Sequence, residues 1–190
     1  MKIVFATGNP HKLQELKAIA GDCDIEFILP PDGFDPIENG KTFEENSLIK
    51  AKEAARLSGE ISLADDSGLC VEILGGEPGI YSARYAETPQ KRIDKLLNNI
   101  KNATNRNAKF VCAMSLVSPD GDLIFQTKGE CHGCIAETQA GTNGFGYDPI
   151  FVPNNKTCTM AELSEDEKNE ISHRGNALRN VLLYLKDRRF

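Results

Sequence analysis

Residues 2–10, KIVFATGNP, decide the fold class of this 190-residue chain. The β-branched and aromatic run Lys2–Ala6 predicts a short buried strand. Asn9 is a good N-cap, and Pro10 suits the first helical position because proline lacks only an N–H that would be unpaired there. The helix that follows ends at Gly21. The chain therefore opens with a strand, a glycine turn and a helix N-terminus, an arrangement that can hold an anion.

A second helix and strand follow at residues 42–68. Thr42-Phe43-Glu44-Glu45 is a capping box, which predicts a helix to about Ser58. Ile61–Ala64 predicts a short strand that leaves the sheet at Asp65-Asp66-Ser67-Gly68, and Leu69–Leu74 predicts another strand. Ligands of open α/β sheets collect at the carboxyl ends of strands, so we expect a functional site at this acidic pair. An ordinary Asp-Ser-Gly turn explains the pattern equally well.

The acidic pair also suggests a metal site. Two adjacent acids cannot both face the core, so at least one of Asp65 and Asp66 should meet solvent or a cation. Oxygen ligands suit Mg²⁺, which takes one or two carboxylates together with substrate phosphates. Glu38 is a candidate second carboxylate, and Asp35 lies nearby in the same loop.

The remaining pattern completes an α/β chain with a mixed sheet. Ala108–Val117 and Leu123–Gln126 flank a turn and predict a hairpin. Another short strand is expected at Ile135, Ala140–Pro149 is a glycine-rich loop, and Ser172-His173-Arg174-Gly175 begins the closing helix. Length predicts one domain over residues 1–190, with room for two lobes.

Composition limits the possible partners. The formal charge is −6, which argues against nucleic-acid polymers and anionic membranes but leaves a small anionic ligand open. No stretch is apolar for long enough to be a secretory or membrane-spanning segment. The six cysteines lack the density of a secreted scaffold. We therefore expect a reduced, cytoplasmic protein.

Several familiar motifs are absent or incomplete. The chain has no P-loop, and the glycines of residues 141–146 lack dinucleotide-binding spacing. Cys131-His132-Gly133-Cys134 is a single CxxC without a second pair, so zinc or redox chemistry there is a minor alternative to cysteines in or near a strand. Ser172 and His173 are adjacent and do not face each other on a helix, which argues against a serine hydrolase.

Six groups of residues nevertheless follow one another in a recognisable order. They are Thr7-Gly8-Asn9 with Lys12; Phe43-Glu44-Glu45-Asn46 with Lys50-Ala51; Ala64-Asp65-Asp66-Ser67-Gly68-Leu69; Leu74–Tyr85; Gly141–Phe151; and Ala161-Glu162-Leu163, Glu167-Lys168-Asn169 and Ser172–Gly175. In this order and spacing, over about residues 2–185, the chain resembles the inosine triphosphate pyrophosphatase family, the non-canonical purine nucleoside triphosphate pyrophosphatases.

The resemblance implies a fold and an activity. Members of this family hydrolyse ITP, dITP and XTP to the monophosphate and pyrophosphate with Mg²⁺, which keeps deaminated purines out of nucleic acid. Their α/β fold has two lobes on a long mixed sheet with the active cleft between them, and they are usually homodimers. The substrate is a small purine nucleoside triphosphate.

The resemblance also implies roles for individual residues. Asp66 would be the proton acceptor and a Mg²⁺ ligand, and Glu38 would be the second ligand. The expected substrate-binding residues are Thr7, Gly8, Asn9, Pro10, His11, Lys12, Lys50, Ser67, Phe145, Gly146, Tyr147, Asp148, Lys168, His173 and Arg174.

These roles support a mechanism. We expect a Mg²⁺-assisted water to attack the α-phosphorus while Asp66 takes its proton, with Lys12 and Lys50 concentrating positive charge. Donors from His173 or Arg174 would meet the 6-keto oxygen of the base and disfavour the amino group of adenine. Two alternatives remain: a pyrophosphatase for modified pyrimidine triphosphates, and a nucleotide sensor without turnover.

Overall fold

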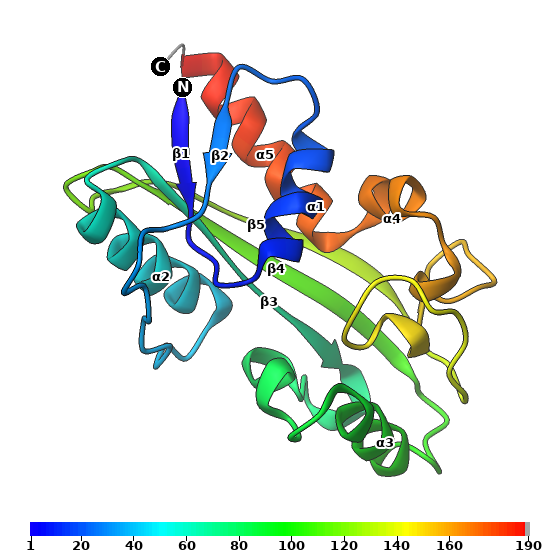
Figure 1. Ribbon diagram of the computed structural model, residues 1–190. Coiled ribbons are helices and arrows are strands. Elements are labelled where there is room, and N and C mark those ends of the chain that lie inside the picture. The colour runs from blue at the N-terminus through cyan, green and yellow to red at the C-terminus, as the bar shows by residue number, and fades with distance from the viewer. Residues whose placement is uncertain (189–190) are drawn as a thin grey trace. The chain divides into compact units, whose positions relative to one another are not determined.

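The computed structural model describes residues 1–188, which contain one six-stranded mixed sheet in the order β2-β1-β3-β4-β5-β6 (Figure 1). β1 is parallel to β2 and β3, whereas β6 is antiparallel to β5. The predicted α/β class with a mixed sheet is therefore confirmed. The strands are β1 (Lys2–Phe5), β2 (Glu26–Ile28), β3 (Ser62–Val71), β4 (Asn107–Val117), β5 (Leu123–Ile135) and β6 (Phe151–Pro153).

Five α-helices accompany the sheet in the described residues. They are α1 (Pro10–Ala20), α2 (Phe43–Ser58), α3 (Pro89–Asn99), α4 (Glu165–Ile171) and α5 (His173–Arg188). Short 3₁₀ helices occupy Glu72–Leu74, Gly79–Arg84, Asp148–Ile150 and Met160–Glu162. No helix within residues 1–188 is long and apolar enough to cross a membrane.

The contacts divide the chain into two compact units. The first comprises Met1–Asp66, Cys112–Gly129 and the chain from His173 onward, and the second comprises Ser67–Val111 and Glu130–Ser172. Strands β3, β4 and β5 contribute residues to both units. The single domain over residues 1–190 and the active cleft between lobes stay predictions.

In the first unit, strand periodicity divides the core into two layers. Ile3 and Phe5 of β1 belong to one apolar cluster, together with side chains of α1 and α5. Val4 belongs to a second cluster that includes three alanines of α2. Because successive side chains of a strand point to opposite faces, β1 serves both layers at once. β3 continues the pattern, with Leu63 in the first cluster and Ala64 in the second.

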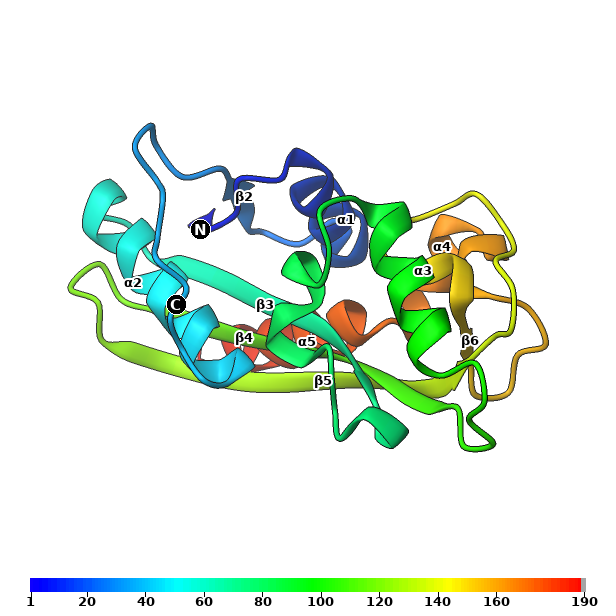
Figure 2. The same ribbon diagram turned by 90° about the horizontal axis from the view of Figure 1, so that it is seen from below.

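In the second unit, a separate apolar cluster joins α3 to the far halves of the long strands. Its buried members include Leu69, Leu96, Phe110 and Phe151. The rings of Phe110 and Phe151 lie 4.6 Å apart between centroids. β4 and β5 run side by side in both views, as the predicted hairpin requires (Figures 1 and 2).

Helix α2 begins and ends as its sequence predicts. The Thr42 side chain accepts from the backbone N–H of Glu45, as predicted, but the Glu45 carboxylate accepts from the N–H of Lys41 and not from that of Thr42, as a full capping box would require. Gly59 closes the helix in the left-handed region at φ 67°. An N-cap of this kind contributes about 1 kcal/mol. These caps fix where the side chains on the inner face of α2 lie.

Two predictions of strand boundaries were wrong. Asp65-Asp66-Ser67-Gly68 is not a turn: β3 runs without a break from Ser62 to Val71, and the expected strand at Leu69–Leu74 is its continuation followed by a 3₁₀ helix. β1 and β4 both pair with β3, and cationic side chains partner its two carboxylates. Likewise, Ile135 ends the single long strand β5 and does not form a strand of its own.

Candidate functional site

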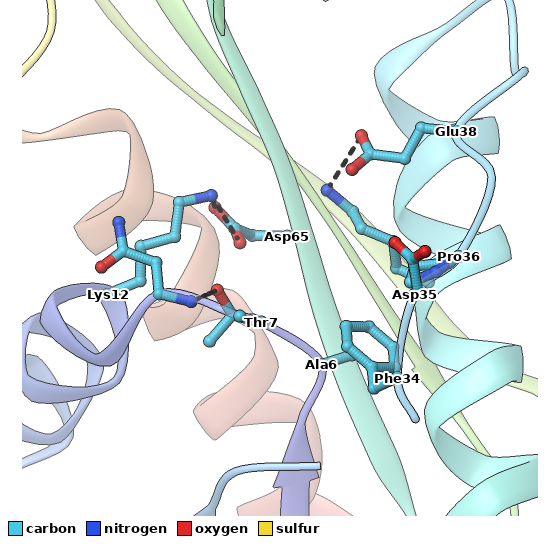
Figure 3. A pocket seen from close by; sticks show the side chains of 11 residues that line it. Ala6, Thr7, Lys12, Phe34, Asp35, Pro36, Glu38 and Asp65 are labelled. Atoms are coloured by element: carbon cyan, nitrogen blue, oxygen red, sulfur yellow. Dashed lines mark hydrogen bonds and ion pairs between the residues drawn. The ribbon is translucent and has the colours of Figure 1, made fainter. Parts of the chain in front are cut away.

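A cavity of about 350 Å³ lies in the first unit at the carboxyl end of β1 (Figure 3). Three segments supply its walls: the turn from β1 to α1, the loop that precedes α2, and the middle of β3. The lining residues are Ala6, Thr7, Gly8, Asn9, Lys12, Phe34, Asp35, Pro36, Glu38, Lys50 and Asp65. The cavity is thus lined by charged side chains of both signs and by the backbone of a glycine turn.

The turn from β1 to α1 is held by its own backbone and by one hydroxyl. The N–H of Thr7 donates to the carbonyl of Phe5 at 2.8 Å, and the N–H of Asn9 donates to Thr7 Oγ1 at 3.1 Å. α1 then begins at Pro10 and carries no acidic residue in its first turn. Because no carboxylate in the first turn of α1 offsets the partial positive charge of the helix N-terminus, this end of the helix favours a bound anion.

Asp65 is the fully buried member of the acidic pair. Lys12 Nζ donates to both of its carboxylate oxygens, at 3.1 and 3.2 Å (Figure 3), and Arg174 donates from Nε and Nη2 at 3.2 and 3.0 Å. Burial alone would raise the pKa of Asp65, but the charges of Lys12, Arg174 and Lys50 hold it well below its usual range. Asp65 is therefore ionised at any physiological pH.

Asp66 points to the other face of β3, toward α2. Asn46 Nδ2 donates to Asp66 Oδ2 at 3.1 Å, and Lys50 Nζ donates to Oδ1 at 3.2 Å. Burial raises the pKa of Asp66 above its usual value, although Lys50 and Asn46 oppose the rise; Glu38 adds to it. The pKa values of two consecutive carboxylates are thus shifted in opposite directions. Such a difference is typical of a pair in which one carboxylate stays ionised and the other exchanges protons.

Lys50 connects Asp66 to the loop before α2. Its ammonium lies 3.3 Å from Glu38 Oε2 as well as 3.2 Å from Asp66 Oδ1. Burial would lower the pKa of Lys50, but the charges of Asp65, Asp66 and Glu38 outweigh it and raise that pKa. One lysine therefore brings the two carboxylates predicted as metal ligands to a common point.

The donors present fit a hard divalent cation. Glu38 and Asp66 offer oxygen ligands only, and Mg²⁺ is usually held by one or two carboxylates plus substrate phosphates. In residues 1–188, no three His, Cys, Asp or Glu side chains form a group that could enclose a metal by themselves. A cation at this point would therefore complete its coordination with oxygens of water or of a bound ligand.

The second unit holds a separate polar cluster around Asp148. Its carboxylate accepts from the backbone N–H of Phe145 at 2.8 Å and from Lys168 Nζ at 2.8 Å. The Lys168 ammonium also lies 4.6 Å from the centre of the Phe145 ring. Gly144 adopts φ 72°, and a Cβ added there would lie 2.1 Å from Asp148 Oδ2, so only glycine leaves room for this carboxylate.

The model of the Ham1 family matches residues 3–184. The chain belongs to the Ham1 family. It is 46% identical over 184 residues to the dITP/XTP pyrophosphatase of Prochlorococcus marinus (strain NATL1A), covering 97% of this chain and 93% of that protein. The resemblance inferred from the motifs is therefore confirmed.

Solved Ham1 structures have the same fold. The Staphylococcus aureus Ham1 protein superposes with a TM-score of 0.89 at 43% identity, covering 99% of this chain and 100% of that one. A Ham1 protein from Coxiella burnetii gives a TM-score of 0.89 at 40% identity, covering 98% and 99%. Both comparisons run over nearly the full length, so the architecture described above is that of the Ham1 family.

Within this Ham1 chain, the predicted site residues fall into two groups. Thr7, Gly8, Asn9, Lys12, Glu38 and Lys50 line the cavity of the first unit, and Asp66 contacts Lys50. Phe145, Gly146, Tyr147, Asp148 and Lys168 lie in the second unit, as does Ser67 of β3. Pro10 and His11 lie in the first turn of α1, and the side chain of His11 is outside the described part of the structure. Their roles toward a nucleotide stay predictions.

The two predicted aromatics differ in exposure. Phe145 is 46% exposed, whereas Tyr147 is buried in the apolar cluster and its hydroxyl donates to the carbonyl of Ser82 at 3.0 Å. Burial raises the pKa of Tyr147 above its usual value. Of the two, Phe145 is therefore the better candidate for stacking on a base.

Arg174 lies deep in the first unit. Its Nη1 donates to Glu15 Oε2 at 2.5 Å while Nε and Nη2 hold Asp65, and the side chain is 1% exposed. Burial would lower the pKa of Arg174, but the charges of Asp65 and Glu15 raise it. His173, the first residue of α5, is buried as well.

Sequence reasoning gave no role to Glu15 or Asn46 and named Asp65 only as one of the acidic pair, although all three contact predicted site residues. One signal was available for Asn46: it lies four residues before Lys50 on one helix, and such residues share a face. For Asp65, the signal was the period of two along a strand, which the incorrect assignment of a turn concealed.

Proposed function

We propose that this chain hydrolyses the non-canonical purine nucleoside triphosphates dITP, XTP and ITP to the nucleoside monophosphate and pyrophosphate. The observation that carries the proposal is the setting of Asp66. Its carboxylate has a raised pKa and contacts a lysine that also reaches Glu38, in a chain closely similar to proteins named dITP/XTP pyrophosphatase.

The phosphates would bind in the cavity of the first unit. Lys12 and Lys50 present ammonium groups there, and the backbone of Thr7, Gly8 and Asn9 forms its turn wall. A triphosphate carries about four negative charges, which the acidic chain as a whole repels, so local cations must offset them. These residues supply that local charge.

Asp66 is proposed as the proton acceptor. A carboxylate whose pKa lies above its usual value takes a proton from water more readily than an ordinary one. Asn46 and Lys50 hold its two oxygens, so the group keeps one orientation. Mg²⁺, held by Glu38 and Asp66, would supply Lewis-acid activation of the water and charge stabilisation on the phosphates.

Asp65 has a different part in the proposal. Its lowered pKa keeps it ionised, and its contacts fix the ammonium of Lys12 and the guanidinium of Arg174. It therefore positions a cation for the phosphates and takes no proton itself.

Base contacts are proposed at Phe145–Asp148, Lys168 and His173. The ring of Phe145 would stack on the base. A donor from His173 at the 6-keto oxygen would favour inosine and xanthine over adenine, which presents an amino group there. We expect His173→Ala to lower kcat/KM for dITP more than for dATP, which has no keto oxygen to accept from His173; equal losses would contradict this role.

One experiment tests the reaction directly. Pyrophosphate release is measured from dITP, XTP, ITP, GTP, ATP and a modified pyrimidine triphosphate, each with Mg²⁺ and with EDTA. We expect dITP, XTP and ITP to be hydrolysed rapidly and only with Mg²⁺. In ¹⁸O-labelled water the label should enter the monophosphate; label in pyrophosphate would contradict attack at the α-phosphorus. A preference for the pyrimidine would overturn the proposed substrate class.

The resemblance also supports a homodimer and a cytoplasmic location, which we propose on that ground alone. Sedimentation at several protein concentrations tests the first, and fractionation of cells that express the chain tests the second.

A further inference from the structure

The side chain of Asn46 is fully buried and lies between two parts of the candidate site. Its Nδ2 donates to Asp66 Oδ2 at 3.1 Å, and its Oδ1 accepts from the backbone N–H of Gly40 at 2.8 Å. Each end of the amide thus has one partner of the required kind. If the amide were flipped, its NH₂ group would face the N–H of Gly40 and its oxygen would face the Asp66 carboxylate. Neither pair can form a hydrogen bond, so the two partners fix the orientation of the amide.

Gly40 allows this contact because it has no side chain. A Cβ added there would lie 2.6 Å from Asn46 Oδ1 and 2.9 Å from the Asn46 backbone nitrogen. Gly40 is only two residues after Glu38 in the loop before α2. Asn46 therefore connects the loop that carries one candidate metal ligand to the strand that carries the other.

Lys50 makes the same kind of connection one helical turn later. It reaches Glu38 at 3.3 Å and Asp66 at 3.2 Å. Lys50 can also meet phosphate, whereas Asn46, at 0% exposure, is closed to ligand. When a ligand competes for Lys50, Asn46 is the connection that stays in place.

From this geometry we infer that Asn46 is a positioning residue for the pyrophosphatase reaction. Its amide holds Asp66 and the Glu38 loop in place relative to each other, so that both carboxylates could serve one divalent cation. The inference rests on the proposed function. Side chains that orient metal ligands typically change metal affinity or activity by about 10- to 100-fold when removed.

The test compares two variants with a matched control. Asn46→Leu has nearly the same size and removes both hydrogen bonds. Gly40→Ala leaves the amide intact and disturbs the same contact from the loop. Ser47→Ala is the control, because Ser47 is equally buried on α2 but contacts Ser115 and the carbonyl of Glu44. Thermal melting identifies the variants that remain folded.

Two measurements are made on the full chain. Mn²⁺ binding is followed by water proton relaxation without nucleotide, and kcat and KM are measured for dITP. We expect Asn46→Leu and Gly40→Ala to bind Mn²⁺ at least about tenfold more weakly and to lose kcat similarly. KM for dITP should change little, since the phosphate-binding lysines remain. Ser47→Ala should match the wild type in both.

Several outcomes would overturn the inference. They are unchanged Mn²⁺ affinity in folded Asn46→Leu or Gly40→Ala, a rise in KM with kcat unchanged, or an equal loss in Ser47→Ala. If the wild type hydrolyses none of the nucleotides, the proposed function fails, but the Mn²⁺ titration still decides whether Asn46 sets the metal site. Equal Mn²⁺ affinities of the wild type and folded Asn46→Leu would then contradict the inference.

Discussion

Asp65 and Asp66 are neighbours on β3, yet their carboxylates accept hydrogen bonds from side chains of different helices. Asp65 accepts from Lys12 of α1 and Arg174 of α5, whereas Asp66 accepts from Asn46 and Lys50 of α2. The alternation of a strand therefore places one acid in each of the two layers of the first unit. The same alternation lowers one pKa and raises the other.

The first prediction concerns Asp66. Asp66→Asn keeps the shape of the side chain and removes the proton acceptor, so we expect kcat for dITP to fall by about 10²- to 10⁴-fold. Nucleotide binding, measured by calorimetry with EDTA present, should persist because Lys12 and Lys50 remain. A variant that keeps full turnover would assign the proton to another group.

The second prediction concerns acid stability and Asp65. The folded pKa of this group lies below its unfolded value, so its stabilisation is complete above the unfolded pKa of about 3.9 and is lost as the pH falls toward the folded pKa. Asp65→Asn should cost about 3–5 kcal/mol near neutral pH, because it leaves buried cations without their partner.

Urea unfolding in EDTA at pH 7 and at several values below pH 4 checks this. The difference in unfolding free energy between the wild type and Asp65→Asn should shrink as the pH falls. A difference that stays constant with pH would show that the carboxylate charge contributes little.

The third prediction uses two glycines of one loop. Gly144→Ala would push the Asp148 carboxylate away from Lys168, whereas Gly146→Ala meets no atom within 4 Å and changes only backbone strain at φ 64°. That strain costs about 1–2 kcal/mol. We expect Gly144→Ala to raise KM for dITP well beyond the effect of Gly146→Ala, measured by steady-state kinetics. Equal effects would remove the Asp148–Lys168 pair from substrate binding.

The fourth prediction concerns Cys131 and Cys134. Burial, with a smaller contribution from Asp148, raises the pKa of the Cys131 thiol to about 11, whereas Cys134 is exposed. Because the thiolate is the reactive form, iodoacetamide near pH 8 should label Cys134 long before Cys131. Mass spectrometry of the peptides measures both rates. Comparable labelling would mean that the strand opens readily at Cys131.

The sequence was sufficient to predict those helices and strands whose start and stop signals lie within a few residues of their ends. α2 has the Thr42 N-cap at one end and Gly59 at the other, and both lie next to the helix they bound. The continuity of β3 was missed because Asp-Asp-Ser-Gly resembles a turn locally. Its carboxylates are stabilised by Lys12, 53 residues away, and by Arg174, 109 residues away, which no local pattern reveals.

The candidate site shows the same division. Lys12 was predicted from the glycine turn that precedes it, and Lys50 from the motif at the start of α2. The role of Asn46 depends on Gly40 and Asp66 meeting its two ends, which only the folded chain brings about. Sequence motifs therefore point to candidate ligand-binding residues more readily than to residues that hold other side chains in place.

The pairing of Lys12 and Lys50 with carboxylates has a consequence for turnover. A phosphate that binds at either lysine would meet an ammonium that already has an anionic partner. The net electrostatic gain would be smaller than at an unpaired cation, because the carboxylate already offsets part of the charge. When pyrophosphate departs, the lysines would still contact these carboxylates and would not be left without a partner. Product release is then easier than from a pocket of unpaired cations, as an enzyme requires and a tight-binding sensor does not.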